Sequence, residues 1–128
     1  MRDFAAGGSQ RVEYVRHERN AGLPATRNTG FRHAQTDLLA ILDADDLWRP
    51  NHLELSLATL EASAADLVFS GCQLFDSNTG AELETRVPPP GSLQDFPLSL
   101  HDGRIVIQPS TVLLRRHWVE RGGFHSAF

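Results

Sequence analysis

Residues 38–46 decide the fold, and they read Leu38-Leu39-Ala40-Ile41-Leu42-Asp43-Ala44-Asp45-Asp46. The five apolar residues at the start are too few to cross a membrane, and they predict a strand buried on both faces, as in the middle of a mostly parallel sheet. The acids that follow lie at the carboxyl end of this strand, where open α/β sheets bind their ligands. The stretch therefore predicts an α/β domain with a ligand site at this edge of the sheet.

The acidic end of the stretch has two interpretations. Asp43 and Asp45 project to the same side if the strand geometry persists, and their carboxylates are hard oxygen ligands for a divalent cation such as Mg²⁺ or Mn²⁺. Alternatively, the acids form a solvated turn in which Asp46 caps the helix that follows. Both interpretations stay open on these residues alone.

A helix is predicted to begin near Pro24, because the missing N–H of proline is not needed in a first turn. In that phase Arg27, Phe31 and Ala34 share the face that packs on the sheet. A guanidinium on such a face needs a partner, which is either a ligand or the carboxylate of Asp43 at the end of the next strand. Ligand binding and a structural salt bridge are therefore equal alternatives for Arg27.

Three neighbours of Arg27 are also candidate residues. Gly22 permits a tight turn before the helix. Asn28 has an amide that ties the loop at Asn20 together, and Gly30 is a small residue where helix and strand approach closely. Each of them serves either the fold or a ligand site.

The rest of the chain continues the alternation of helices and strands. The helix after Pro50 has an apolar stripe at helical spacing, which predicts core at Leu53, Leu57, Leu60 and Ala64. Residues 67–75 predict one strand, with Cys72 as a small buried hydrophobe. This order implies right-handed crossovers and a sheet that is parallel at its centre. Further strands are expected at 11–15, 82–87, 105–107 and 111–114, helices at 2–6, 92–100 and 115–121, and a turn at 76–80.

Composition narrows the class of protein. The chain has 128 residues, which is the length of one domain. Its net charge of −4 and its 12 scattered Lys and Arg residues argue against binding of nucleic acid. The single cysteine forms no internal disulfide, and no segment is apolar and long enough to span a bilayer. Ser70 and Ser110 lie in no nucleophile elbow, so serine hydrolysis is not predicted. Trp118, Phe124 and Phe128 are expected in the core or in an acceptor pocket.

Two motifs and the strand between them resemble the nucleotide-sugar half of a family 2 glycosyltransferase with the GT-A fold. In chain order these are Asn20-X-Gly22, Ala25-X-Arg27-Asn28-X-Gly30 with Ala34, the apolar strand, Asp43-Ala44-Asp45-Asp46-X-Trp48-X-Pro50, and Leu53. Weaker similarity continues at Arg115-Arg116 and Gly122-Gly123-Phe124. The fold class implied is α/β, with a mostly parallel, Rossmann-like sheet and flanking helices.

The resemblance implies transfer of a sugar from a nucleoside-diphosphate sugar to a hydroxyl acceptor, which is a saccharide, a lipid-linked molecule or a protein. It implies inversion and assistance by Mg²⁺ or Mn²⁺. Asp45 would bind the metal that bridges the diphosphate, Asp43 would contact the ribose or the metal, and Arg27 would lie near the nucleobase. The donor pocket is accordingly expected at Asn20, Gly22, Arg27, Asn28, Asp43, Ala44, Asp45 and Asp46.

Two segments of the family pattern are not found in the sequence, namely a first apolar strand with its acid and a later acid taken as the catalytic base. We therefore expect a single domain incomplete at both ends, with residues 1–75 as the nucleotide-sugar half and 76–128 as the acceptor-side half, and we name no base. The expected location is the cytoplasm, including the inner face of a membrane.

Three alternatives to the enzyme remain. The chain is then a binding module that keeps the donor pocket without catalysis, or it assembles as a homodimer through an exposed sheet edge. A phosphatase of the haloacid dehalogenase type also has Asp-X-Asp after an apolar strand. That family has Thr or Val at the position of Asp46, and it does not explain Arg27-Asn28.

Overall fold

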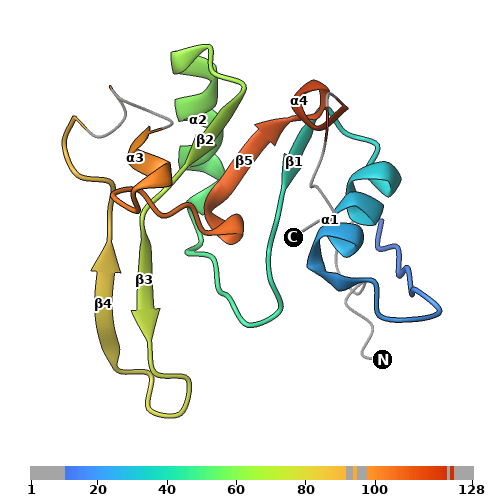
Figure 1. The fold of residues 1–128 in the computed structure, drawn as a ribbon, viewed down its shortest axis with the longest axis horizontal. Coiled ribbons are helices and arrows are strands. Elements are labelled where there is room, and N and C mark those ends of the chain that lie inside the picture. The colour runs from blue at the N-terminus through green and yellow to red at the C-terminus, as the bar shows by residue number, and fades with distance from the viewer. Residues whose placement is uncertain (1–10, 92–93, 95–97, 121, 123–128) are drawn as a thin grey trace.

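The computed structural model describes residues 11–91, 94, 98–120 and 122. Within them a three-stranded sheet has helices packed on it, and a separate two-stranded hairpin stands beside it (Figure 1). The sheet contains β1 (Leu38–Ala40), β5 (Val112–Arg115) and β2 (Leu67–Phe69), and its long helices are α1 (Gly22–His33) and α2 (His52–Ser63). The α/β character is therefore confirmed. The helix expected at 2–6 lies outside the described residues.

The sheet has the order β1-β5-β2, and β5 runs antiparallel to both neighbours. Leu39 pairs with Leu114, and Val68 pairs with Leu113. Because β1 and β2 are both antiparallel to β5, they run in the same direction, with α2 as the connection between them. A crossover between two strands of the same direction therefore exists, and its expected right-handedness stays a prediction. Among the described strands the parallel pairing expected at the centre is not observed, because β5 lies between β1 and β2.

The strand buried on both faces is β5, whereas β1 was expected to be. Val112, Leu113 and Leu114 are each less than 7% exposed. Residues from outside the sheet, Phe31 among them, pack against the cluster that contains Val112 and Leu114. In β1 only Leu39 is buried, and the strand ends at Ala40, which is exposed. The prediction of a strand buried on both faces over residues 38–42 was therefore wrong, since β1 has three residues and Leu42 beyond it is exposed.

The two long helices differ in how well their buried faces were predicted. On α1, Phe31 and Ala34 pack against the core formed by Leu39, Val112 and Leu114, as expected. On α2, the stripe was largely wrong. Leu60 is fully buried, but Leu53 and Leu57 are 44% and 36% exposed, and Ala64 is exposed beyond the end of the helix. The buried line of α2 instead joins Leu60 to Ser56, one turn earlier.

Residues 67–75 form two strands rather than the one expected. β2 ends at Phe69, and β3 (Cys72–Phe75) pairs with β4 (Glu82–Arg86) in the separate hairpin. Gly71 lies at this change of sheet, where a Cβ would come within 2.7 Å of the Arg86 carbonyl oxygen and of Val87 Cγ1. Glycine is therefore the residue that lets the chain pass from one sheet to the other. Cys72 is only partly buried.

The hairpin itself was predicted correctly. Its strands are antiparallel, and the turn at 76–80 is held by Asp76, whose Oδ1 accepts hydrogen bonds of 2.8 Å from the N–H groups of Asn78 and Thr79. These bonds, that of Thr79 first, lower the pKa of Asp76.

The remaining elements are short. They are α3 (Leu98–His101), the 3₁₀ turn η1 (Pro109–Thr111) and α4 (Arg116–Glu120). β5 and α4 confirm the strand and helix expected near 111–121, but residues 11–15 and 105–107 form no strand. Ile105 is nevertheless buried, because the irregular segment before η1 inserts it into the core.

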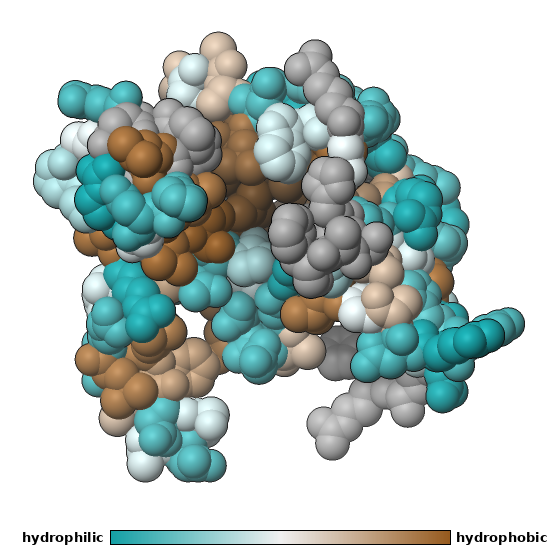
Figure 2. Space-filling view, in the orientation of Figure 1, coloured by the Kyte–Doolittle hydropathy of each residue, from teal (hydrophilic) through white to brown (hydrophobic). Residues whose placement is uncertain are grey.

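The visible surface is mostly polar, and hydrophobic side chains gather in a hollow between α3 and β5 (Figure 2). Among the described residues, no helix combines the length and the apolar character that crossing a bilayer requires.

Candidate functional site

Arg27 and Asp43 are in direct contact. Nη2 of Arg27, in the second turn of α1, donates to Oδ2 of Asp43 at 2.9 Å and to Oδ1 at 3.2 Å. The two side chains are 16% and 32% exposed, so the pair is partly withdrawn from water. Of the two alternatives expected for Arg27, the contact with Asp43 is observed, and ligand binding stays a prediction.

The acids after β1 form a turn. The N–H of Asp46 donates to the carbonyl oxygen of Asp43 at 3.2 Å. This turn is the alternative form expected for the stretch, but Asp46 does not cap α2, because the N-cap residue is Asn51 and no side chain caps it. Ala44 and Asp45 are exposed at the turn, and Asp45 has no hydrogen bond or ion pair to another described residue.

Ser110 holds the acidic turn in place, and sequence reasoning missed this role. Its hydroxyl oxygen accepts a 2.9 Å hydrogen bond from the N–H of Asp43, and its carbonyl oxygen accepts one of 2.6 Å from Nε1 of Trp48. Ser110 is buried in η1, directly before β5. The signal in the sequence is Pro109 followed by small hydroxyl residues in front of an apolar strand.

The tight turn expected at Gly22 is present at the start of α1, and the side chain of Asn20 holds it. Oδ1 of Asn20 accepts a 2.9 Å hydrogen bond from the N–H of Gly22, and Gly22 has φ +81°, which a side chain would strain. Asn28 is partly buried on α1. The close approach expected at Gly30 is wrong, because an added Cβ would meet nothing within 4 Å.

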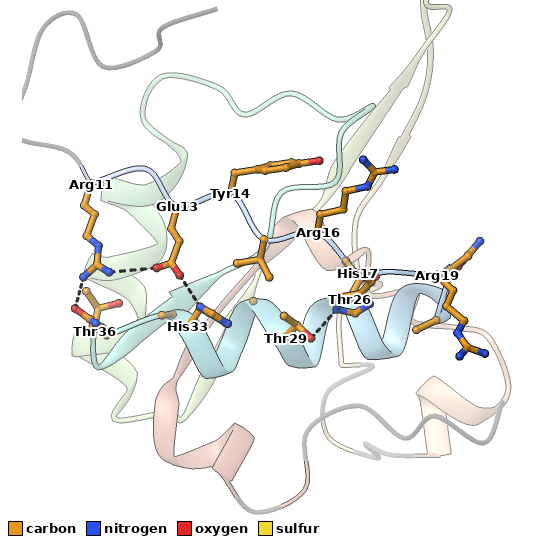
Figure 3. A pocket seen from close by; sticks show the side chains of 16 residues that line it. Arg11, Glu13, Tyr14, Arg16, His17, Arg19, Thr26, Thr29, His33 and Thr36 are labelled. Carbon is orange, nitrogen blue, oxygen red and sulfur yellow. Dashed lines mark hydrogen bonds and ion pairs between the residues drawn. The ribbon is translucent and has the colours of Figure 1, made fainter. Parts of the chain in front are cut away.

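A cavity of about 790 Å³ lies between residues 11–21 and the outer side of α1. Figure 3 shows the segment lying along the helix, with Glu13 turned toward His33 and Tyr14 pointing away from it. Nδ1 of His33 lies 2.6 Å from Oε1 of Glu13, which fixes the segment to the end of α1. Of the predicted donor residues, only Asn20 lines this cavity.

A second cavity, of about 630 Å³, lies between the loop after β1, α2 and the β3–β4 hairpin, and Asp46 lines it. The linings of both cavities leave out Arg27 and Asp43. The structure therefore brings Arg27 to Asp43, but it places Asn20 and Asp46 at two different cavities.

The described residues contain no group of three or more His, Cys, Asp and Glu that could hold a metal ion by themselves. Mg²⁺ is commonly bound by one or two carboxylates together with substrate phosphates, and the exposed carboxylate of Asp45 suits that kind of site. The residues present thus fit a metal shared with a phosphate ligand.

Arg115, the last residue of β5, and Arg116, the first residue of α4, fix the loops that lead into the sheet. Nε of Arg116 donates to the carbonyl oxygen of Thr36 at 2.8 Å, and its Nη2 donates to that of Ala34. Nε of Arg115 donates to the carbonyl oxygen of Ala65 at 3.3 Å. The loop before β1 is therefore attached to the start of α4, and the loop before β2 is attached to the end of β5. In the sequence, these arginines were noted only as part of the weaker similarity to family 2 glycosyltransferases.

Fold and site together define an α/β domain with an acidic turn just after an edge strand and an arginine from the preceding helix. The chain belongs to glycosyl transferase family 2, whose family model matches residues 1–123. The family resemblance inferred from the sequence is therefore confirmed.

Named relatives agree with this assignment. The chain is 28% identical over 120 residues to an uncharacterized glycosyltransferase of Bacillus subtilis, YwdF, which covers 91% of this chain and 42% of the relative. It is 37% identical over 70 residues to an uncharacterized glycosyltransferase of Methanocaldococcus jannaschii, covering 54% of this chain and 24% of the relative.

A third relative, from Escherichia coli, is named UDP-Glc:alpha-D-GlcNAc-diphosphoundecaprenol beta-1,3-glucosyltransferase WfgD. It is 25% identical to the chain over 69 residues, which cover 54% of this chain and 27% of that protein. The chain thus spans about a quarter to two fifths of the length of these relatives. No solved structure matches the chain.

Proposed function

We propose that the surface around Arg27 and the acidic turn binds the nucleoside diphosphate of a sugar donor, and that the protein transfers the sugar to a hydroxyl acceptor with inversion. The contact between Arg27 and Asp43 is the observation that carries the proposal, because it joins the two motifs that the family resemblance connects. In this proposal the residues that bind the nucleotide all come from the half 1–75.

Each residue has a role in this proposal. Asp45, exposed and without a partner among the described residues, would hold Mg²⁺ or Mn²⁺ together with the diphosphate. The ion would stabilise the negative charge that forms on the departing nucleoside diphosphate. Asp43 would contact the ribose or the metal while the Arg27 contact fixes its carboxylate, and Arg27 would lie near the nucleobase. Gly22, Asn28 and Ala44 would shape the pocket, and Asn20 and Asp46 would border it, each from its own cavity.

The donor site can be tested by titrating the chain with UDP, GDP or dTDP in the presence of Mn²⁺ in a calorimeter. One of them should bind, and chelation of Mn²⁺ should weaken that binding. Asp45→Asn should weaken it about tenfold or more, since a charged ligand to the metal is lost. Glu61→Gln is the matched control, because Glu61 is an exposed acid on α2 outside both cavities.

Binding that Asp45→Asn leaves unchanged, or no binding of any of the three nucleotides, would contradict the proposed donor site. A transfer assay then uses the nucleotide that binds, supplied as its conjugate with a radiolabelled sugar. Transfer of the label distinguishes an enzyme from a module that only binds the donor.

A further inference from the structure

The second cavity is a groove with walls from distant parts of the chain. One wall is the loop after β1 and the first turns of α2, and the other is the β3–β4 hairpin (Figure 1). We call it the hairpin groove and define it by Asp46, Trp48, Leu55, Gln73 and Glu82, which all line it. Its volume of about 630 Å³ is in the range of small-molecule sites.

The walls of the hairpin groove are fixed to each other. Nη2 of Arg49 donates to Oε1 of Gln73 at 2.9 Å, which connects the loop after β1 to β3. The Trp48 ring stacks on the His52 ring, with centroids 5.1 Å apart and planes inclined by 26°. The position of Trp48 is set further by its bond to the Ser110 carbonyl oxygen. The groove is therefore held in shape without a ligand.

The side chains of the groove suit a ligand rich in hydroxyl groups. Trp48 and Leu55 give it an apolar wall, and Leu55 is 58% exposed. Gln73, Gln108 and Glu82 contribute amide and carboxylate groups that donate to or accept from hydroxyls. A sugar ring combines an apolar C–H face with a rim of hydroxyls, so it matches an aromatic wall beside amides and a carboxylate.

The groove is connected to the acidic turn through Ser110 and through Asp46. Ser110 accepts from the N–H of Asp43 through its hydroxyl and from Trp48 through its carbonyl oxygen. The groove also begins at Asp46, the last acid of the turn. We infer that the hairpin groove binds the saccharide that accepts the transferred sugar, an inference that rests on the proposed function of the acidic turn.

The test is a titration of the ¹⁵N-labelled chain with four disaccharides, cellobiose, chitobiose, lactose and maltose, followed by NMR. At least one of them should shift the indole N–H of Trp48 and the side-chain amide of Gln73. Gln73→Ala should weaken that binding about fivefold, while UDP and Mn²⁺ binding changes by less than about twofold. Gln35→Ala is the matched control, because Gln35 also accepts from an arginine, Arg11, at 2.9 Å but lies outside the groove.

The outcomes separate the two proposals. Nucleotide binding without any disaccharide shift, or shifts that centre on Trp118 in α4, would overturn the acceptor groove and leave the donor site standing. Disaccharide binding at Trp48 and Gln73 without nucleotide binding would overturn the donor site and, with it, the acceptor role of the groove. Equal loss of disaccharide binding in Gln73→Ala and Gln35→Ala would also overturn the acceptor role of the hairpin groove.

Discussion

Arg27 on α1 donates from one nitrogen to both carboxylate oxygens of Asp43, at 2.9 and 3.2 Å, across sixteen positions of the chain. The side chains are 16% and 32% exposed, so this pair lies between a surface ion pair and a buried one. It both attaches α1 to the acidic turn and sets the direction of the Asp43 carboxylate.

We expect Arg27→Ala to lower the free energy of unfolding by about 1–2 kcal/mol, between the values typical of exposed and buried pairs. A double-mutant cycle with Asp43→Ala, measured by urea unfolding, gives the coupling energy. The same cycle on Arg86 and Glu84 is the control, because that pair has the same 2.9 Å distance but side chains 42% and 55% exposed. Equal coupling in the two cycles would show that partial burial adds nothing to the Arg27 pair.

The sequence predicted this contact because it depends on local rules. The helical phase of α1 places Arg27 on the face of Phe31 and Ala34, and an apolar strand followed by acids places Asp43 at its end. The order of the strands was not predictable in the same way. The apolar runs at 38–42 and 111–114 have similar composition, and only the long-range pairing makes β5 the central strand and β1 an edge.

The site shows the same division between local and distant effects. The turn at Asn20 and Gly22 was predicted from glycine's conformational freedom, and the structure bears it out. The hydrogen bond from Asp43 to Ser110 joins residues 67 positions apart, and the periodicity of the sequence contains no information on such a contact. The change of sheet at Gly71 was missed because residues 67–75 are apolar on both sides of it.

Gly71→Ala should destabilise the protein by about 1–3 kcal/mol, since a Cβ within 2.7 Å of the Arg86 carbonyl oxygen forces the hairpin to move. Gly30→Ala is the opposite case. It lies inside α1 with nothing within 4 Å of an added Cβ, and it should stabilise by about 0.5–1 kcal/mol. Urea unfolding measures both, and an unchanged midpoint for Gly71→Ala would refute the close contact.

Leu60→Ala should destabilise by about 2–5 kcal/mol, because Leu60 is fully buried between α2 and the sheet. Leu57→Ala, on the same helix but 36% exposed, should have a clearly smaller effect. The comparison decides which line of α2 faces the core, since both leucines belong to the stripe predicted from the sequence. Thermal unfolding of the two variants measures both effects. Similar losses of stability would support the stripe of core residues predicted from the sequence.

His52 should make the stability depend on pH. Burial lowers its pKa from the ordinary value of 6.5, and its Nε2 is buried without a hydrogen-bond partner among the described residues. Between the lowered value and 6.5 the unfolded chain binds more protons than the folded one, so the stabilisation is complete above 6.5 and is lost as the pH falls below it.

The urea midpoint should therefore be lower at about pH 5.5 than at about pH 7.5, and His52→Phe, which keeps a ring beside Trp48, should reduce the difference. The carboxyl pKa of Asp76 is lowered from 3.8, so its stabilisation is lost only in more acidic solution than this comparison uses. His101→Asn is the control, since His101 is exposed. If His52→Phe and the parent chain lost stability equally between the two pH values, protonation of His52 would not be the cause.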